Sequence, residues 1–204
     1  MEPTTMKRND TPLLASRRFF LRASLASAFA LGTMPLAGSD VLAAGKGDNV
    51  LVVYFSHSGN TRTIAEMIHQ RVGGDIVEIE TVKPYPDDYD ACVEQAREEQ
   101  RANVFPEIST VIPNMEKYRT VFLGYPNWWG TMPRAVFTFL TAYNMDDKTV
   151  APFCTHGGSA MGTSESDIRK LCPKARILKG LPVRGRSVRG AGSTVDSWLQ
   201  SIVF

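Results

Sequence analysis

The chain has 204 residues, with 23 Lys or Arg against 21 Asp or Glu, so its formal net charge at pH 7 is +2. This near balance argues against nucleic acid as the main partner, because nucleic-acid-binding domains usually carry a basic patch or stripe. Its three cysteines, Cys92, Cys154 and Cys172, lack the spacing of a metal site, and no metal ligand is expected. The spacing does not decide whether any two of them form a disulfide.

An export signal is indicated at the N-terminus. Residues 16–22 read Ser-Arg-Arg-Phe-Phe-Leu-Arg, which resembles a twin-arginine motif, and an Ala-rich apolar stretch follows. Residues 41–43 read Val-Leu-Ala, with small residues at positions −3 and −1 of a signal-peptidase site, so cleavage is expected after Ala43 or Ala44. We therefore expect residues 1–43 to direct the protein through the twin-arginine export machinery to the periplasm. The alternative is a chance pair of arginines in an N-terminal tail.

The remainder, residues 44–204, is expected to be one domain. About 161 residues are enough for a single hydrophobic core. The leader carries five of the basic and three of the acidic side chains, so the rest of the chain is formally neutral. No segment in this remainder is long and apolar enough for a membrane span of about 20 residues.

Apolar runs of strand length alternate with helical patterns along this domain. We predict strands and helices in turn over residues 49–55, 61–71, 75–80, 89–102, 120–124, 133–143, 149–154, 164–171, 175–178 and 194–202. The last helix is expected to begin with the capping pair Ser193 and Asp196, after a Gly/Arg-rich loop over residues 180–192. Strands separated by helices indicate an α/β fold with a doubly wound parallel sheet of five strands.

The polar turn after the first predicted strand has the features of a phosphate site. This first loop consists of Ser56, His57, Ser58, Gly59, Asn60 and Thr61. A helix N-terminus follows it, where backbone amides lack partners and the helix dipole is positive. The loop contains no cation before Arg62, which favours a phosphomonoester held by neutral donors over a triphosphate. The alternative is an ordinary strand–helix turn rich in Ser and Gly.

Residues 52–68, which include the first loop, resemble the flavodoxin signature. In that family an aliphatic strand leads to an aromatic residue, a Ser or Thr, a small residue and a further Thr before the helix. The resemblance extends over about residues 49–200 and implies a three-layer sandwich with strand order 2-1-3-4-5. It implies FMN as the cofactor, with its 5′-phosphate in the first loop. The chain resembles the short-chain type, because its fifth strand lacks a long insertion.

A pair of tryptophans follows the third predicted strand. This second loop consists of Pro126, Asn127, Trp128, Trp129 and Gly130. An indole offers a broad uncharged face on which a flat aromatic ligand can stack. The segment resembles the Pro-x-Trp-Trp-Gly loop of the family, which implies that one indole stacks on the flavin and the other packs beneath it. The alternative is that both indoles fill the core.

Two glycines follow the fourth predicted strand. This third loop consists of Thr155, His156, Gly157, Gly158 and Ser159. The resemblance implies that its amides approach the N1/O2 edge of the flavin, where reduction builds negative charge. Many short flavodoxins carry a Tyr here that covers the outer flavin face. This chain has none, so that face is expected to be open to a substrate.

Two histidines lie in the expected site. His57 could contact the phosphate or the ribityl chain. His156 could donate a proton near the ring, or it could be a solvated hydrogen-bonding residue. No cation is expected close to the flavin, and this would disfavour the anionic reduced form and lower the potential.

The function that these features favour is electron transfer through bound FMN, with a redox protein or a quinone as partner. One alternative is an FMN-dependent reductase of quinone or nitro compounds that acts over the open flavin face. A further alternative is a non-catalytic FMN-binding module. No side chain is expected to act as a catalytic nucleophile.

Overall fold

Six strands form one parallel sheet in the part of the chain that the structure, a computed structural model, describes, residues 47–204. The strands are β1 (Val50–Tyr54), β2 (Asp75–Glu78), β3 (Thr120–Pro126), β4 (Thr149–His156), β5 (Arg176–Ile177) and β6 (Leu181–Arg184). Their order is β2-β1-β3-β4-β5, and β6 also pairs with β4. The expected α/β fold and strand order are confirmed. The expected twin-arginine signal and its cleavage site lie outside the described residues.

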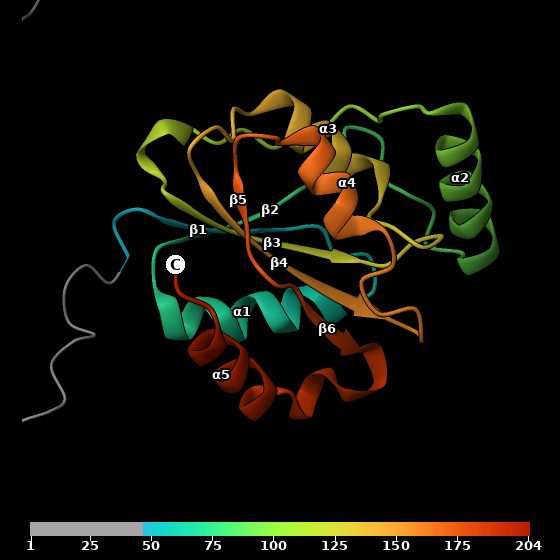
Figure 1. Ribbon diagram of the computed structural model, residues 1–204. Coiled ribbons are helices and arrows are strands. Elements are labelled where there is room, and N and C mark those ends of the chain that lie inside the picture. The colour runs from blue at the N-terminus through green and yellow to red at the C-terminus, as the bar shows by residue number, and fades with distance from the viewer. Residues whose placement is uncertain (1–46) are drawn as a thin grey trace, which may run out of the picture. The chain divides into compact units, whose positions relative to one another are not determined.

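Helices cover both faces of this sheet. They are α1 (Asn60–Val72), α2 (Tyr89–Ala102), α3 (Arg134–Ala142), α4 (Ser164–Leu171) and α5 (Gly192–Ser201), with 3₁₀ turns η1 (Met115–Lys117) and η2 (Gly185–Gly190). Figure 1 shows α1 and α5 against one face and α3 and α4 against the other. α2 stands at the end of the sheet toward which β3 and β4 point (Figure 1). The arrangement is the expected three-layer sandwich.

The central strands are buried on both faces because their sequences are apolar without interruption. All five residues of β1 are buried, and successive side chains point into opposite cores. Leu51 and Val53 pack with α3 and α4, whereas Val52 and Tyr54 pack with α1 and α5. Burial on both faces is what a parallel sheet covered by two helical layers requires.

The winding of the chain changes direction at β1, which pairs with β2 on one side and with β3 on the other. Ligands of such sheets bind outside the carboxyl ends of the strands at this point. Because β4 is the next parallel neighbour of β3, the segments that follow β1, β3 and β4 meet at one edge. These segments are the first, second and third loops.

The fifth strand is interrupted, where the sequence predicted one strand over residues 175–178. β5 has two residues, and β6 returns to pair with β4 inside the segment that was expected to be a Gly/Arg-rich loop. Between them, the amide of Gly180 donates to Glu165 Oε1 at 2.7 Å, so it has a side-chain acceptor in place of a strand partner. The interruption raises the number of strands from five to six.

Boundaries of β3, β4 and α5 also differ from the prediction. β3 and β4 each extend two residues farther, so Pro126, Thr155 and His156 lie at strand ends rather than in irregular loops. α5 begins at Gly192 without a side-chain cap, so the predicted capping pair is wrong. Its Asp196 forms an ion pair with Arg71 of α1 instead, a contact between elements far apart in the sequence.

None of the helices within residues 47–204 combines the length and the apolar character needed to cross a membrane. All three cysteines are free and buried. Burial raises the pKa of the Cys154 thiol to about 12 and that of Cys172 to about 11. Both thiols are therefore protonated and unreactive at neutral pH.

Candidate functional site

The first loop presents free backbone amides at the N-terminus of α1. Gly59 precedes the helix with φ +81°, a left-handed conformation that suits glycine, and as a glycine it has no side chain to cap the helix. Within the described residues, the amides of Ser58, Gly59, Asn60 and Thr61 form no hydrogen bond. The loop is closed by Ser56 Oγ, which accepts from the Arg62 amide at 3.2 Å. Amides directed outward at a helix N-terminus can bind an anion.

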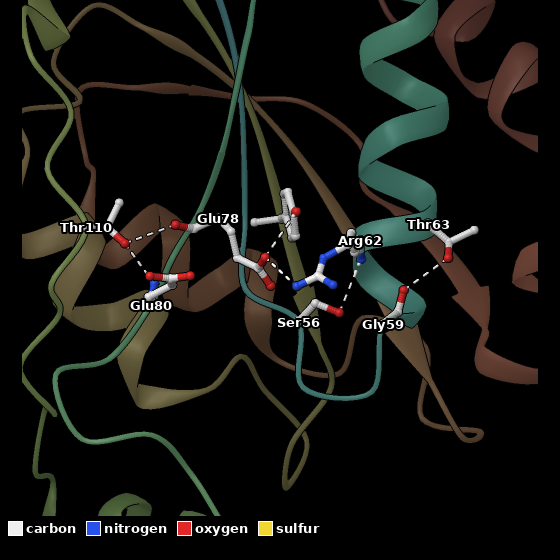
Figure 2. A network of polar contacts seen from close by, with 8 residues as sticks. Ser56, Gly59, Arg62, Thr63, Glu78, Glu80 and Thr110 are labelled. Carbon is white, nitrogen blue, oxygen red and sulfur yellow. Dashed lines mark hydrogen bonds and ion pairs between the residues drawn. The ribbon is translucent and has the colours of Figure 1, made fainter. Parts of the chain in front are cut away.

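The one cation next to this loop along the sequence is already neutralised. Arg62 Nη2 donates to Glu78 Oε2 at 2.6 Å (Figure 2), and the Tyr54 hydroxyl donates to the same oxygen at 3.3 Å. The ion pair with Glu78 raises the pKa of Arg62 above its usual value. Figure 2 shows the Arg62 guanidinium directed toward β2, while Gly59 and Thr63 mark the start of the helix. The loop itself is left with neutral donors, as the sequence indicates.

The first and third loops are joined beneath the site. Thr61 Oγ1 and Thr155 Oγ1 lie 2.8 Å apart in a buried hydrogen bond. Thr61 lies in the first turn of α1 and Thr155 near the end of β4, so the bond joins residues 94 positions apart in sequence. Both threonines were predicted to be site residues, and the structure brings them together. With its hydroxyl engaged, Thr61 offers a ligand its backbone amide.

Hydrogen bonds of Asn127 link the second loop to the third. Its amide donates to the carbonyl of Thr155 at 2.8 Å, and its Nδ2 donates to the carbonyl of Ala160 at 2.9 Å. Its Oδ1 accepts from the amide of Gly130 at 3.0 Å. Every polar group of the Asn127 side chain thus has a protein partner, which makes it a structural residue of the site.

The two tryptophans have different surroundings. Trp128 is half-buried, and its ring is edge-on to Tyr85, Phe55 and His57, with centroids 5.0, 5.5 and 5.9 Å away. Trp129 is 50% exposed, and its Nε1 donates to the carbonyl of Val93 in α2 at 3.1 Å. One indole therefore belongs to an aromatic cluster, while the other has a face that a flat ligand can reach.

Trp129 also has a strained backbone, with φ +53°. A non-glycine residue in this region costs about 1–3 kcal/mol, and such strain concentrates at functional sites. Across the site, Gly162 approaches the second loop so closely that a Cβ there would lie 1.9 Å from the Gly130 carbonyl oxygen. The amide of Thr163 donates to that same oxygen at 2.8 Å. The turn at Trp129 and Gly130 is thus held by backbone contacts from beyond the third loop.

The third loop also presents free amides. Within residues 47–204 the amides of Gly157, Gly158 and Ser159 form no hydrogen bond, and a Cβ at either glycine would meet open space. His156 turns back into the loop, where its Nδ1 accepts from the amide of Ala160 at 3.1 Å. That bond requires the neutral ring with its hydrogen on Nε2. Burial and the charge of Arg184 lower the pKa of His156, which favours this form.

His57 is directed away from the free amides of its own loop. Its Nε2 donates to the carbonyl of Pro86 at 2.9 Å, which joins the first loop to the segment before α2. A cavity of about 400 Å³ lies on this side of the first loop, with Ser56, His57, Tyr85 and Asp87 among its lining. No residue of the second or third loop lines it. The cavity therefore adjoins the predicted site and does not coincide with it.

Three contributors to the site were not found by sequence reasoning: Gly162, Arg184 and Gly185. Arg184 Nη1 donates to the Gly157 carbonyl oxygen at 3.4 Å. A Cβ at Gly185 would lie 3.1 Å from Asn60 Nδ2. The arginine-rich character of this segment is visible in the sequence, but only the unexpected strand β6 brings Arg184 to the end of β4.

The donor set fits the expected cofactor. Two groups of free amides, at the ends of β1 and β4, flank a loop that carries a half-exposed indole. The first group, together with hydroxyls, suits the phosphate of a monoester. The second group suits the polar edge of a heteroaromatic ring, and the indole suits its face.

Known proteins were compared with this chain in sequence and in structure. The curated proteins include no match to the chain. A protein from Bacteroides uniformis ATCC 8492, provisionally named a flavoprotein, is 29% identical, with a TM-score of 0.67 over 76% of this chain and 99% of that one. A similarly named protein from Bacteroides eggerthii DSM 20697 is 30% identical, with a TM-score of 0.62 over 74% of this chain and 99% of that one.

A flavoprotein from Lactobacillus acidophilus NCFM, solved in complex with FMN, is 23% identical, with a TM-score of 0.58 over 72% of this chain and 99% of that one. At that identity the likeness shows the fold. The family model described as flavodoxin matches residues 49–202, which is most of the chain. Since this match includes all three loops, the chain belongs to the flavodoxin family.

Proposed function

We propose that this protein binds FMN non-covalently in the three loops, transfers electrons through it, and works outside the cytoplasm after export. The observation that carries the FMN assignment is the pair of free-amide groups on the first and third loops, joined by the Thr61–Thr155 hydrogen bond. Membership of the flavodoxin family supports the assignment. A structural neighbour solved in complex with FMN also supports it.

Each loop has a distinct role in this proposal. The amides of Ser58 to Thr61 hold the phosphate, and the exposed face of Trp129 orients the ring. The amides of Gly157 and Gly158 stabilise negative charge that develops at the edge of the ring. The bound flavin supplies the redox chemistry, while the protein supplies binding, orientation and electrostatics.

A non-covalent link follows from the state of the nucleophilic side chains. The three cysteines are buried, and Cys154 Sγ lies 3.4 Å from the Ala160 carbonyl oxygen beneath the third loop. His57 Nε2 and His156 Nδ1 are each held by a hydrogen bond with the backbone. The buried thiols are therefore not available to attach to a flavin, and each histidine has one ring nitrogen fixed by the protein.

The assignment is tested by releasing the cofactor. Acid precipitation of the natively expressed protein is expected to leave a yellow supernatant with about one FMN per chain, identified by mass. The colourless protein should then bind FMN more tightly than riboflavin, because the phosphate adds contacts in the first loop. Release of FAD, or a protein that ignores added FMN, would refute the assignment.

A second candidate function is an FMN-dependent reductase of quinone or nitro compounds. The observation that favours it is the cavity of about 400 Å³ beside Ser56 and His57, which is large enough for a small aromatic substrate. The exposed glycines of the third loop and the absence of a covering Tyr there are compatible with such access.

Kinetics of the loaded protein separate the candidates. Electron transfer as the function predicts fast exchange with a purified redox protein and slow turnover of small quinones. A reductase predicts rapid steady turnover of quinone or nitro compounds at saturable rates. Binding of FMN with neither activity would support a non-catalytic module.

A further inference from the structure

Arg184 lies at the junction of the first and third loops. It is the last residue of β6 and pairs in register with His156 at the end of β4, where the two strands lie side by side (Figure 1). Its Nη1 donates to the Gly157 carbonyl oxygen at 3.4 Å. The next residue, Gly185, borders Asn60, and a Cβ at Gly185 would lie 4.0 Å from the His156 carbonyl oxygen. The end of β6 therefore lies beside both the first and the third loop.

The charge of Arg184 is not neutralised by an ion pair. Two other arginines beside the site are paired, Arg62 with Glu78 and Arg97, which lies over the Trp129 ring, with Glu94. Arg184 is exposed, and no ion pair within residues 47–204 includes it. The positive charge acts on the third loop, because it helps to lower the pKa of His156 after the larger effect of burial.

We propose that Arg184 is a positioning residue that holds the third loop through Gly157 and supplies the positive charge that favours the reduced, anionic flavin there. The proposal rests on the proposed function, because it takes FMN as the ligand of the three loops. It differs from the expectation from sequence that no cation lies close to the flavin. A fixed positive charge beside a developing negative charge stabilises the charged state.

The size of the effect follows from exposure. Solvent screens Arg184, so the expected change is that of an exposed charge pair, about twofold to fivefold in an equilibrium constant. The Arg184→Gln variant should lower by that factor the affinity for reduced FMN relative to oxidised FMN. For a two-electron couple this corresponds to a fall of about 10–20 mV in midpoint potential. The difference should shrink at high ionic strength.

Matched variants distinguish the effect of the Arg184 charge from an effect on folding. Arg184→Lys keeps the charge and should retain the potential of the unchanged protein. Arg176→Gln removes the same charge from β5 at the opposite edge of the sheet, since Arg176 pairs with Thr149 at the start of β4. It should leave the potential unchanged. Arg184→Met, which keeps an unbranched apolar side chain, provides a second variant without the charge.

A readout that needs no flavin is the titration of His156 by NMR in protein purified without added FMN. Arg184 is the charged side chain that lowers the pKa of His156, so Arg184→Gln should raise that pKa. Arg184→Lys and Arg176→Gln should not change it. Melting temperatures of all variants verify that the fold is retained.

Several outcomes would overturn the proposal. It is wrong if both neutral variants keep the potential and the pKa of His156, or if Arg184→Lys behaves like Arg184→Gln. It is also wrong if the loss affects both oxidation states of FMN equally and vanishes with riboflavin, because the charge would then act on the phosphate. A protein that binds no FMN at all would refute the proposed function instead, and the His156 titration would still test Arg184.

Discussion

Among the single residues of the site, Trp129 has a side chain that is exposed to solvent and is also held in place by the protein. Its ring is half exposed, its Nε1 is fixed on the backbone of α2, and its own backbone is strained. Arg97 of α2 lies over the ring at 5.9 Å from the centroid. A rigid indole with an accessible face loses little entropy when a planar ligand stacks on it. We therefore propose that Trp129 stacks on the flavin and that Trp128 supports it.

Replacing Trp129 should weaken FMN binding more than replacing either other tryptophan. Stacking contributes about 0.5–1.5 kcal/mol beyond buried area, and the lost apolar contact adds to this. Trp129→Ala should therefore lower FMN affinity about tenfold or more, since tenfold equals about 1.4 kcal/mol. Titration by quenching of flavin fluorescence measures this change.

Conservative variants serve as controls for that experiment. Trp129→Phe keeps an aromatic face and should retain most of the affinity. Trp198→Phe alters the buried tryptophan of α5, which packs in the core on the other face of the sheet, and should leave FMN affinity unchanged. Equal affinities for Trp129→Ala and the unchanged protein would show that this indole does not contact the flavin.

His156 should make stability depend on pH. Its folded pKa lies below the ordinary value of 6.5, first because of burial and then because of Arg184. The unfolded chain therefore binds the proton more readily, so the contribution to stability is full above about pH 6.5 and is lost as the pH falls below it. Protonation of Nδ1 also breaks the bond from the Ala160 amide.

Urea unfolding at pH 7.5 and pH 5.5 measures this effect against a variant that does not titrate. His156→Asn can accept from the Ala160 amide at both pH values, so its free energy of unfolding should fall less between them. An NMR pKa of 6.5 or higher for His156 would contradict the assignment.

At the scale of elements, the site is assembled by contacts between loops. Asn127 joins the second loop to the third, and Thr61 joins α1 to β4. Gly162, with φ +56°, allows the segment after the third loop to approach Gly130. The three loops are therefore joined into one unit by side-chain hydrogen bonds and close backbone approach.

Gly162→Ala should disrupt this unit. The added Cβ would strain the left-handed backbone and lie 1.9 Å from the Gly130 carbonyl oxygen, an atom that cannot move freely. Overpacking of this kind costs about 1–3 kcal/mol, so the free energy of unfolding should fall by that amount. Gly157→Ala is the matched control, because its Cβ would meet open space.

Urea unfolding of the two variants decides the matter. The control should keep the stability of the unchanged protein, whereas Gly162→Ala should also bind FMN more weakly because the second loop shifts. Equal stability of both alanine variants would show that the close approach at Gly162 imposes no constraint.

At the scale of the whole molecule, the proposed export route is compatible with the proposed cofactor. The twin-arginine route exports folded proteins, so FMN can be bound in the cytoplasm before transport. We expect replacement of Arg17 and Arg18 by Lys to block export without harming the domain, because both residues precede the flavodoxin match. Cell fractionation should then find full-length, flavin-loaded protein in the cytoplasm.

The matched control for export is Lys7→Arg with Arg8→Lys, which alters basic residues outside the motif and should leave export unchanged. Normal delivery of the Arg17→Lys, Arg18→Lys protein to the periplasm would show that the leader does not depend on the twin-arginine route.

The elements with a strong local pattern were predictable. α2 and α4 have the bounds that the helical periodicity indicates, and β1 lies within the predicted first strand and is one residue shorter at each end. The interruption of the fifth strand was not predictable from the sequence. β5 has only two residues, and β6 offers only two buried apolar residues, Leu181 and Val183, which is too short a pattern to indicate a strand. The cap of α5 was misread because Asp196 found a distant partner, Arg71.

The sequence by itself determined the α/β fold class and the three polar segments that follow the strands, and its resemblance to flavodoxins implied the order of the strands. The fold class and the segments depend on apolar runs, glycines and polar turns, which act over a few residues. Only the tertiary structure decided which side chains remain available to a ligand. His57 and Asn127 have protein partners, while Trp129 and the loop amides are accessible. Arg184 reaches the third loop because β6 pairs with β4, a contact between distant segments that no local pattern specifies.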